Sequence, residues 1–249
     1  MGERMPGLGT LVNAVAILFG GFLGLILKQY ISKRIMDTVL QGVGLAVMII
    51  GISGAIGAAF TVVGGKITAD HTMIMIVSLA IGAMAGELIK IESKLEGFGK
   101  YCERKLAKPG EGSAFAQGFV TATLVFCVGS MAIVGSMEDG IHANSDILFA
   151  KSALDGIAAM VFASTMGLGV LFSAVSVGVY QGLMTLLAIF VAPYLSDMVI
   201  AQVSLVGSVL IMAIGANMLK MAQIKVGNLL PAMFVPIVYH IARSFFVWG

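Results

Sequence analysis

The residues of this sequence that could do chemistry are polar side chains set inside long apolar runs. The amide and hydroxyl candidates are Asn13, Gln41, Ser130, Ser173, Gln181 and Gln202. In hydrocarbon such a group must find a partner, so each is expected to face other helices or a wet cavity. One interpretation is ordinary hydrogen bonding between helices, worth about 0.6 kcal/mol on average. The other is a binding site for a small solute.

A charged pair is predicted on one face of a helix. Lys151 precedes Asp155 by four residues, a spacing that places both side chains on the same side of a helix. One interpretation is an ion pair at the membrane interface, about one turn inside the helix. The other is a relay for a proton or another cation.

The stretch VFCVGSMAIVGSMEDG, residues 125–140, is rich in small residues, Ser130 among them. Small residues allow close helix packing, and they also occur where a helix breaks and its backbone lines a cavity. Both interpretations stay open. Glu138 and Asp139 follow at the predicted outer mouth, where they either attract a coupling cation or form an ordinary acidic loop.

Glu87 lies near the end of another apolar run, just before the mixed-charge segment 90–112. Opposite charges spaced three or four residues apart predict that this helix continues out of the membrane into the cytoplasm. We interpret 90–112 as a solvated amphipathic connector or as a surface for a partner or lipid headgroups. Glu87 joins the candidate ion-coupling residues.

Composition indicates the class of protein that holds these residues. The chain has 249 residues, of which 59% are hydrophobic and only 11% charged. A soluble domain carries roughly 25% charged residues, so this is an integral membrane protein whose first partner is the lipid bilayer. The net charge of +2 is uninformative about nucleic acid, and no nucleic-acid partner is predicted. No P-loop, HExxH or GxSxG pattern occurs, so no catalytic residue, cofactor or metal site is expected, and the chain is predicted not to be an enzyme.

A membrane-crossing helix needs about 20 apolar residues. The long apolar stretch from Ser152 to Ser196 carries one charge, Asp155, and is predicted to form two helices that break at residues 166–169, giving eight helices in all. The predicted spans are 8–27, 39–60, 73–91, 115–137, 151–168, 169–196, 199–219 and 229–247. The prediction is an all-α polytopic protein forming a single transmembrane domain over 1–249.

The distribution of basic residues predicts the orientation. With eight crossings, eleven of the fifteen lysines and arginines lie on one side. Merging the two helices around residues 166–169 would leave nine against six. The positive-inside rule therefore favours eight helices with both termini outside.

Two pairs of segments resemble each other in sequence, which suggests that the chain contains an internal repeat. GTLVNAVAILFGG at 9–21 resembles GVLFSAVSVGVYQG at 169–182, with Asn13 aligned to Ser173. With one residue inserted, Gln41 and Gly54 align with Gln202 and Gly215. An offset of five crossings inverts the second copy, which predicts an inverted repeat of 8–91 and 169–247, with helices 115–137 and 151–168 between. Asn13, Gln41, Ser173 and Gln202 would then share a central site.

Several stretches together resemble a bacterial family. They are GTLVNAVAILFGGFLG (9–24), QGVGLAVMIIGI (41–52), IGAMAGELIKIESKLE (81–96), FCVGSMAIVGSMEDG (126–140), KSALDG (151–156) and FSAVSVGVYQG (172–182). They are similar to the domain of unknown function 554, inner-membrane proteins of the YqgA and YdfK type. The resemblance implies a small multi-pass protein of the bacterial inner membrane and no established substrate. It marks as candidates Asn13, Gln41, Glu87, Ser130, Glu138, Asp139, Lys151, Asp155 and Gln181.

The functional hypothesis is a small secondary transporter or permease for a small solute or ion. The amide and hydroxyl residues would bind the solute, and the charged residues would handle the coupling ion. The alternative is a channel-like or non-transporting membrane scaffold that forms a homo-oligomer through glycine-rich faces. A membrane enzyme ranks third, because no catalytic pair is visible in the sequence.

Overall fold

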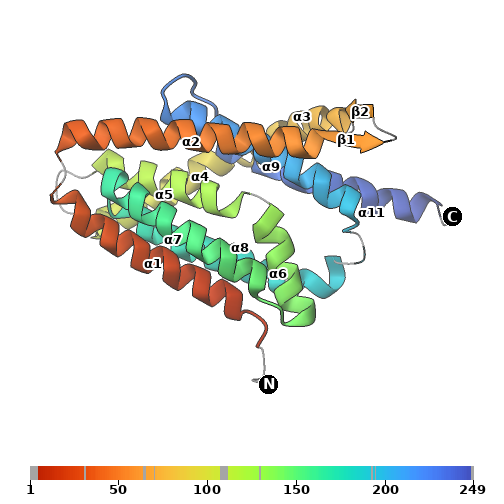
Figure 1. The fold of residues 1–249 in the computed structure, drawn as a ribbon, viewed down its shortest axis with the longest axis horizontal. Coiled ribbons are helices and arrows are strands. Elements are labelled where there is room, and N and C mark those ends of the chain that lie inside the picture. The colour runs from red at the N-terminus through yellow and green to blue at the C-terminus, as the bar shows by residue number, and fades with distance from the viewer. Residues whose placement is uncertain are drawn as a thin grey trace. The chain divides into compact units, whose positions relative to one another are not determined.

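The computed structural model describes residues 5–30, 32–63, 66–69, 71–106, 112–128, 130–191, 193 and 195–247 (Figure 1). Its elements are α1 (Leu8–Lys28), α2 (Lys33–Ala59), β1 (Phe60–Val63), β2 (Lys66–Ala69), α3 (Thr72–Ile89), α4 (Ile91–Leu106), α5 (Gly112–Cys127), α6 (Ser130–His142), α7 (Asp146–Met166), α8 (Gly169–Val191), α9 (Asp197–Met218), α10 (Val226–Leu229), η2 (Leu230–Phe234) and α11 (Val235–Val247). The prediction of an all-α polytopic membrane protein is confirmed.

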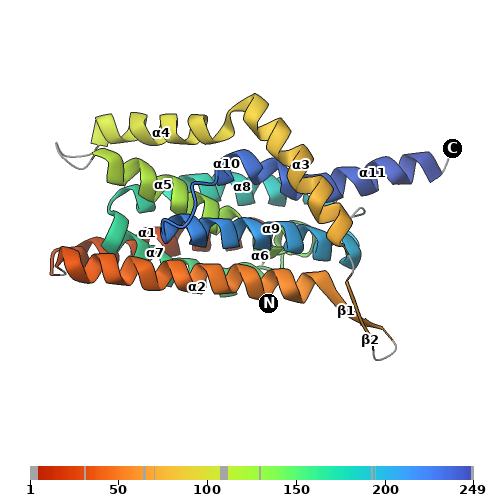
Figure 2. The same ribbon diagram turned by 90° about the horizontal axis from the view of Figure 1, so that it is seen from above.

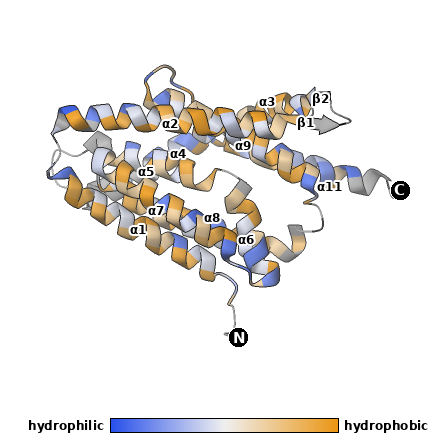
Figure 3. Ribbon diagram, in the orientation of Figure 1, coloured by the Kyte–Doolittle hydropathy of each residue, from blue (hydrophilic) through white to orange (hydrophobic). Residues whose placement is uncertain are grey.

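Six helices of the described part are long and apolar enough to cross a membrane, namely α1, α2, α3, α7, α8 and α9. Figure 3 shows hydrophobic residues along their length. The predicted break between the fifth and sixth spans is also present, since α7 ends at Met166 and Gly167 adopts a left-handed φ of 86°. Glycine tolerates this conformation because it has no Cβ.

The predicted span 115–137 is a broken one. α5 and α6 meet at an angle of 61°, and together they are long and apolar enough to form a seventh span. Phe115 lies against Gly169 at the start of α8, and Gly140 lies against Thr185 near its other end. These contacts are about 24 Å apart along α8. The bent pair therefore follows α8 across most of a membrane thickness, which favours a broken span over a re-entrant loop.

The predicted extension of the third span as one helix is wrong. α3 ends where Lys90 adopts a left-handed conformation, with φ 57°, and a separate helix, α4, begins at Ile91. The amphipathic character of this segment is confirmed, with an exposed pair between Lys100 Nζ and Glu96 Oε2 at 3.9 Å.

The predicted last span is not a continuous α-helix. Residues 230–234 form a 3-10 helix, η2, between α10 and α11. Pro231 and Pro236 explain the interruption, because proline has no N–H to donate within a helix. The eighth crossing stays a prediction.

A β-hairpin follows α2, and the sequence analysis did not predict it. β1 and β2 pair antiparallel from Phe60 opposite Ala69 to Val63 opposite Lys66 (Figure 2). The signal was the run of β-branched residues on both sides of Gly64-Gly65, which is typical of a hairpin.

The chain forms two compact units that interleave in the sequence. Unit 1 holds Met1–Gly42, Ser93–Cys127 and Met131–Phe190. Unit 2 holds Val43–Glu92, Val128–Ser130 and Val191–Gly249. Each unit takes helices from both predicted repeat halves, so that α1 and α8 lie in unit 1, while α2, α3, α9 and α11 lie in unit 2.

Unit 1 is organised around α1 and α7, which pack along their length (Figure 1). Gly9 lies against Leu148, Gly20 against Gly156 and Gly24 against Met160, so the two helices run parallel. A methyl group on Gly20 or Gly24 would overlap a carbonyl oxygen of α7. The small-xxx-small spacing thus serves close backbone approach.

Unit 2 is organised around an antiparallel crossing of α2 and α9. Gly51 lies against Met212, Gly54 against Ser208, and Gly215 against Met48. In the repeat alignment Gly51 corresponds to Met212 and Gly54 to Gly215. Equivalent residues therefore meet at the crossing, which is the arrangement that an inverted repeat requires. The repeat itself stays a prediction.

The close approach of α1 and α7 is testable with one methyl group. We expect Gly20→Ala to lower the stability of the protein by about 1–3 kcal/mol, because the helices must move apart. Gly178→Ala is the matched control, since nothing lies within 4 Å of a Cβ at this helical position. The measurement is the thermal unfolding midpoint in detergent. Equal midpoints for the two variants would contradict the packing.

Candidate functional site

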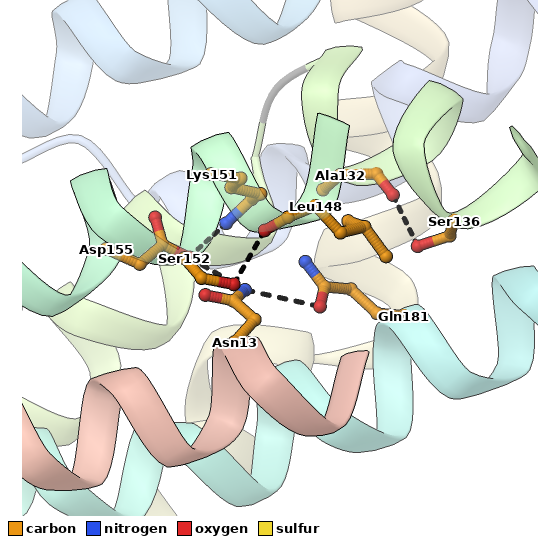
Figure 4. Close-up of polar contacts among 8 residues, drawn as sticks. All are labelled: Asn13, Ala132, Ser136, Leu148, Lys151, Ser152, Asp155 and Gln181. Atoms are coloured by element: carbon orange, nitrogen blue, oxygen red, sulfur yellow. Dashed lines mark hydrogen bonds and ion pairs between the residues drawn. The ribbon is translucent and has the colours of Figure 1, made fainter. Parts of the chain in front are cut away.

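The most deeply buried polar cluster lies in unit 1 and joins three helices. Lys151 and Asp155 of α7 form an ion pair in which both side chains are about nine-tenths buried. The Asn13 amide nitrogen of α1 donates to Asp155 Oδ2 at 3.0 Å and to Gln181 Oε1 of α8 at 3.2 Å. Figure 4 shows the Asn13 amide between these two acceptors. Asn13 and Gln181 are both fully buried.

The direction of these bonds follows from the carboxylate. Because an ionised Asp155 only accepts hydrogen bonds, Asn13 must present its NH₂ group, and Gln181 must then present its oxygen. This leaves Asn13 Oδ1 and Gln181 Nε2 buried with no hydrogen-bond partner among the described residues. An unsatisfied buried polar group costs about 1–3 kcal/mol.

The ion pair forms as predicted, but its place differs from the interface interpretation. α7 begins at Asp146, so Asp155 lies about two and a half turns and about 14 Å along the helix. This is near the midpoint of a helix long and apolar enough to span a membrane. Lys151 and Asp155 are therefore charged groups well inside the span.

Ser173 does not join the cluster through its hydroxyl. It is fully buried, and its hydroxyl donates to the Val170 carbonyl oxygen of the same helix at 2.6 Å. Ser136 and Ser152 behave alike, each donating to the carbonyl oxygen four residues earlier. The hydroxyl groups of these serines find their hydrogen-bond acceptors within their own helix, as short hydroxyl side chains in helices commonly do.

The two acidic residues after the small-residue stretch have different environments. Asp139 is fully buried rather than exposed at a mouth, and its carboxylate accepts from the Gly7 backbone N–H at 2.9 Å and the Ser145 hydroxyl at 2.6 Å. It thus fixes the start of α1 to the α6–α7 connection. Glu138 is half-buried, and its carboxylate lies 3.1 Å from a His142 ring nitrogen.

Gln202 lies in unit 2, within hydrogen-bonding distance of two histidines. Its Nε2 lies 3.3 Å from His71 Nδ1, and its Oε1 lies 3.1 Å from His240 Nε2. His71 directly precedes α3 and His240 lies in α11, so only the fold brings them together. Among the described residues, no group of three or more His, Cys, Asp or Glu could hold a metal ion.

Glu87 is exposed and belongs to a second cluster of unit 2. Its carboxylate pairs with Lys225 Nζ at 3.0 Å and accepts from the Asn228 side chain. Asn228 Oδ1 accepts from the Glu92 backbone N–H at 2.8 Å, and Glu92 in turn accepts from Gly227 N–H. These bonds tie the α3–α4 junction to α10, which is a structural role.

Two predicted residues remain. Gln41 is exposed on α2. Ser130 begins α6, and its side chain lies outside the described part of the structure. Within its own unit, Asn13 contacts Asp155 and Gln181, and Gln202 contacts His71 and His240. The shared site of Asn13, Gln41, Ser173 and Gln202 stays a prediction.

Sequence reasoning missed further buried polar atoms without a partner in the described structure. They are Thr10 Oγ1, Ser78 Oγ, Thr123 Oγ1, Tyr180 Oη and Thr185 Oγ1. For two of them a signal existed: Thr10 stands three residues before Asn13, and Thr185 four residues after Gln181. Each shares a helix face with a candidate that was recognised.

Comparison with known proteins identifies relatives over nearly the whole chain. A family model described as "Protein of unknown function (DUF554)" matches residues 8–241. "Uncharacterized membrane protein YdfK" of Bacillus subtilis is 31% identical over 92% of this chain and 93% of its own length. "Uncharacterized protein YqgA" of Escherichia coli is 28% identical over 92% of this chain and 94% of its own. No solved structure matches.

The buried pair predicts a non-additive effect on stability. We expect Lys151→Met alone to lower the free energy of unfolding by about 3–5 kcal/mol, because it leaves a buried carboxylate unpaired. Adding Asp155→Leu should recover most of this loss, since an apolar pair leaves no unpaired charge. Thermal and denaturant unfolding in detergent measure both.

The exposed pair of Glu96 and Lys100 has the same spacing and is the matched control. Glu96→Gln should change stability by less than about 1 kcal/mol. Additive losses in the Lys151 and Asp155 double variant would contradict the buried pair.

Proposed function

This chain belongs to the DUF554 family, and from that premise we propose that it is a small secondary transporter, which moves a small solute or ion across the bacterial inner membrane with a proton carried on Asp155. The observation that carries the proposal is the Lys151–Asp155 pair, buried near the middle of α7 and bonded to Asn13. Charged groups inside a span are costly and are commonly found on ion pathways and proton relays.

The cluster has two protonation states, which differ by one unit of charge. When Asp155 is ionised, it accepts from both Lys151 and Asn13, and the pair is neutral. A proton on the Asp155 carboxylate turns one of its oxygens into a donor and weakens its hold on Lys151. Asn13 can then turn its amide so that Oδ1 accepts this proton's hydrogen bond. Protonation thereby changes which group Gln181 presents to a solute.

The helix directions support the predicted topology. In unit 1, α1 runs parallel to α7, and α8 runs antiparallel to α1, because Gly21 lies against Leu171 while Asn13 reaches Gln181. These are the directions expected of the first, fifth and sixth of eight crossings. With the positive-inside rule, this supports a multi-pass protein with both termini outside.

The rival scaffold hypothesis has less support from the site. A scaffold or homo-oligomer needs close helix packing, which the glycine contacts supply, but it needs no charged pair at this depth. Nothing in the proposal requires a catalytic step, so the chain is proposed not to be an enzyme. The solute is proposed to meet Asn13 and Gln181, the amides with unpaired atoms.

Proton movement is measurable in proteoliposomes that contain the pH-sensitive dye pyranine. An inward-driving potential is set with valinomycin and a potassium gradient, in buffer alone and with a panel of small organic acids, amines and monovalent ions outside. We expect the wild-type protein to admit protons at least tenfold faster than empty vesicles under at least one condition. Asp155→Asn should reduce this rate to that of empty vesicles, because an amide cannot take the proton.

Asp146→Asn is the matched control, since this exposed carboxylate stands at the start of the same helix. It should transport protons at the wild-type rate. Equal rates for wild type and Asp155→Asn, or no rate above empty vesicles for the wild type, would refute the proton-coupled transporter.

A further inference from the structure

Four buried polar side chains lie on the faces of α1 and α8 that meet at the Asn13–Gln181 hydrogen bond. Each has one nitrogen or oxygen without a partner in the described structure, and each is more than nine-tenths buried. We call this set the α1–α8 polar strip: Thr10, Asn13, Gln181 and Thr185.

The register of the two helices places these residues in two facing pairs. α1 and α8 are antiparallel, and the hydrogen bond from Asn13 to Gln181 fixes one level of the contact. Thr10 lies about 4.5 Å from Asn13 along α1, and Thr185 lies about 6 Å from Gln181 along α8, in the same direction in space. The threonine hydroxyls therefore form the next level, one turn nearer the N-terminal end of α1.

The strip has two distinct ends. At its inner end, Asn13 donates to Asp155. At its outer end, Gly140 of α6 packs against Thr185, and the neighbouring Asp139 holds the Gly7 N–H. In the opposite direction from Asn13 and Gln181, Ile17 and Val177 are fully buried, and the buried Ser173 donates its hydroxyl to a carbonyl oxygen of its own helix. The unpartnered groups of the strip therefore lie between the outer end of unit 1 and Asp155.

The buried hydroxyls of unit 1 fall into two groups: those of Thr10, Thr123, Tyr180 and Thr185 have no partner in the described structure, whereas several serine hydroxyls do. Ser136, Ser152 and Ser173 are as deeply buried, and each donates to a carbonyl oxygen of its own helix. The hydroxyls of Thr10 and Thr185 could also donate to a carbonyl oxygen of their own helix, yet their oxygens have no partner in the described structure. Hydrogen-bonding groups left free in a row beside an ion pair are the lining expected of a path for a polar ligand.

The formal charges in and beside the strip indicate which class of ligand it would bind. No group of the strip carries a formal charge, and Lys151 and Asp155 neutralise each other at its inner end. The free atoms include an amide oxygen that accepts, an amide nitrogen that donates, and two hydroxyls that do both.

We propose that the α1–α8 polar strip is a hydrated path for an uncharged, hydrogen-bonding ligand, of which water is the smallest, and that it gives protons access to Asp155 from the outer end of unit 1. The role in proton access rests on the proposed function, whereas the path itself does not.

Cysteine reactivity tests the path without any transport assay. In a background with Cys102→Ser and Cys127→Ala, the variants Thr10→Cys and Thr185→Cys are reconstituted and treated with 2-hydroxyethyl methanethiosulfonate, a small neutral polar reagent. Ile17→Cys and Val177→Cys are the matched controls, because they are fully buried on the same two helices. Thiols react as thiolates, which form readily only where water reaches them.

We expect the two strip cysteines to react at least tenfold faster than the two control cysteines. Equal rates at all four positions would overturn the path. Fast reaction without proton flux in the wild-type protein would keep the path and remove the transporter. Reaction of the strip cysteines with a charged methanethiosulfonate as fast as with the neutral reagent would overturn the ligand class.

A second pair of variants applies if a cysteine variant does not fold. Thr10→Val with Thr185→Val removes both hydroxyls and keeps the side-chain shape. Proton flux in pyranine vesicles should fall at least fivefold with an unchanged unfolding midpoint. Thr165→Val is its control, because that hydroxyl donates to backbone carbonyl oxygens of α7. Wild-type flux in the double valine variant would overturn the path.

Discussion

The contact between the backbones of α1 and α7 positions the chemistry of unit 1. At Gly20 and Gly24 the two helices approach so closely that one added methyl group would overlap a carbonyl oxygen. This separation is what lets the short side chain of Asn13 reach Asp155 at 3.0 Å across the interface. A wider interface would break this hydrogen bond between Asn13 and Asp155. The glycines of the sequence are therefore part of the polar site, although none of them carries a polar side chain.

The buried charges add a second constraint. An ion pair in a low-dielectric interior gains from its own attraction, but the cost of removing both charges from water offsets much of that gain. An apolar pair at Lys151 and Asp155 would pack as well, so stability gives little reason for charges at this depth. Proton exchange gives a better reason for these charges. A carboxylate held by one lysine and one amide can take up a proton, and this changes its bonds to both groups. The geometry suits a site that changes state rather than one that only holds helices together.

The sequence predicted the class of fold, the break at Gly167 and the pairing of Lys151 with Asp155, because each depends on local composition or on spacing within one helix. It did not predict the partner of Asn13. An inverted repeat relates residues by symmetry, but only residues at the crossing of two equivalent helices touch. Gly51 and Met212 stand at such a crossing and do touch. Asn13 and Ser173 stand on opposite sides of the α1–α8 crossing, so Asn13 meets Gln181 instead. The burial of Asp139 also depends on Gly7 and Ser145, and sequence spacing alone cannot bring these three together.

The two ends of the α1–α8 contact differ in chemistry. At one end Asn13 donates to Gln181, and the unpartnered hydroxyls of Thr10 and Thr185 lie one turn away along their helices. At the other end Gly21 packs against Leu171, and the buried Ser173 donates its hydroxyl to a carbonyl oxygen of its own helix. Under the proposed transport, polar ligands would reach Asp155 from the end that carries the unpartnered amides and hydroxyls. Release at the other end would then require the helices themselves to move, because glycine and leucine pack directly against each other there.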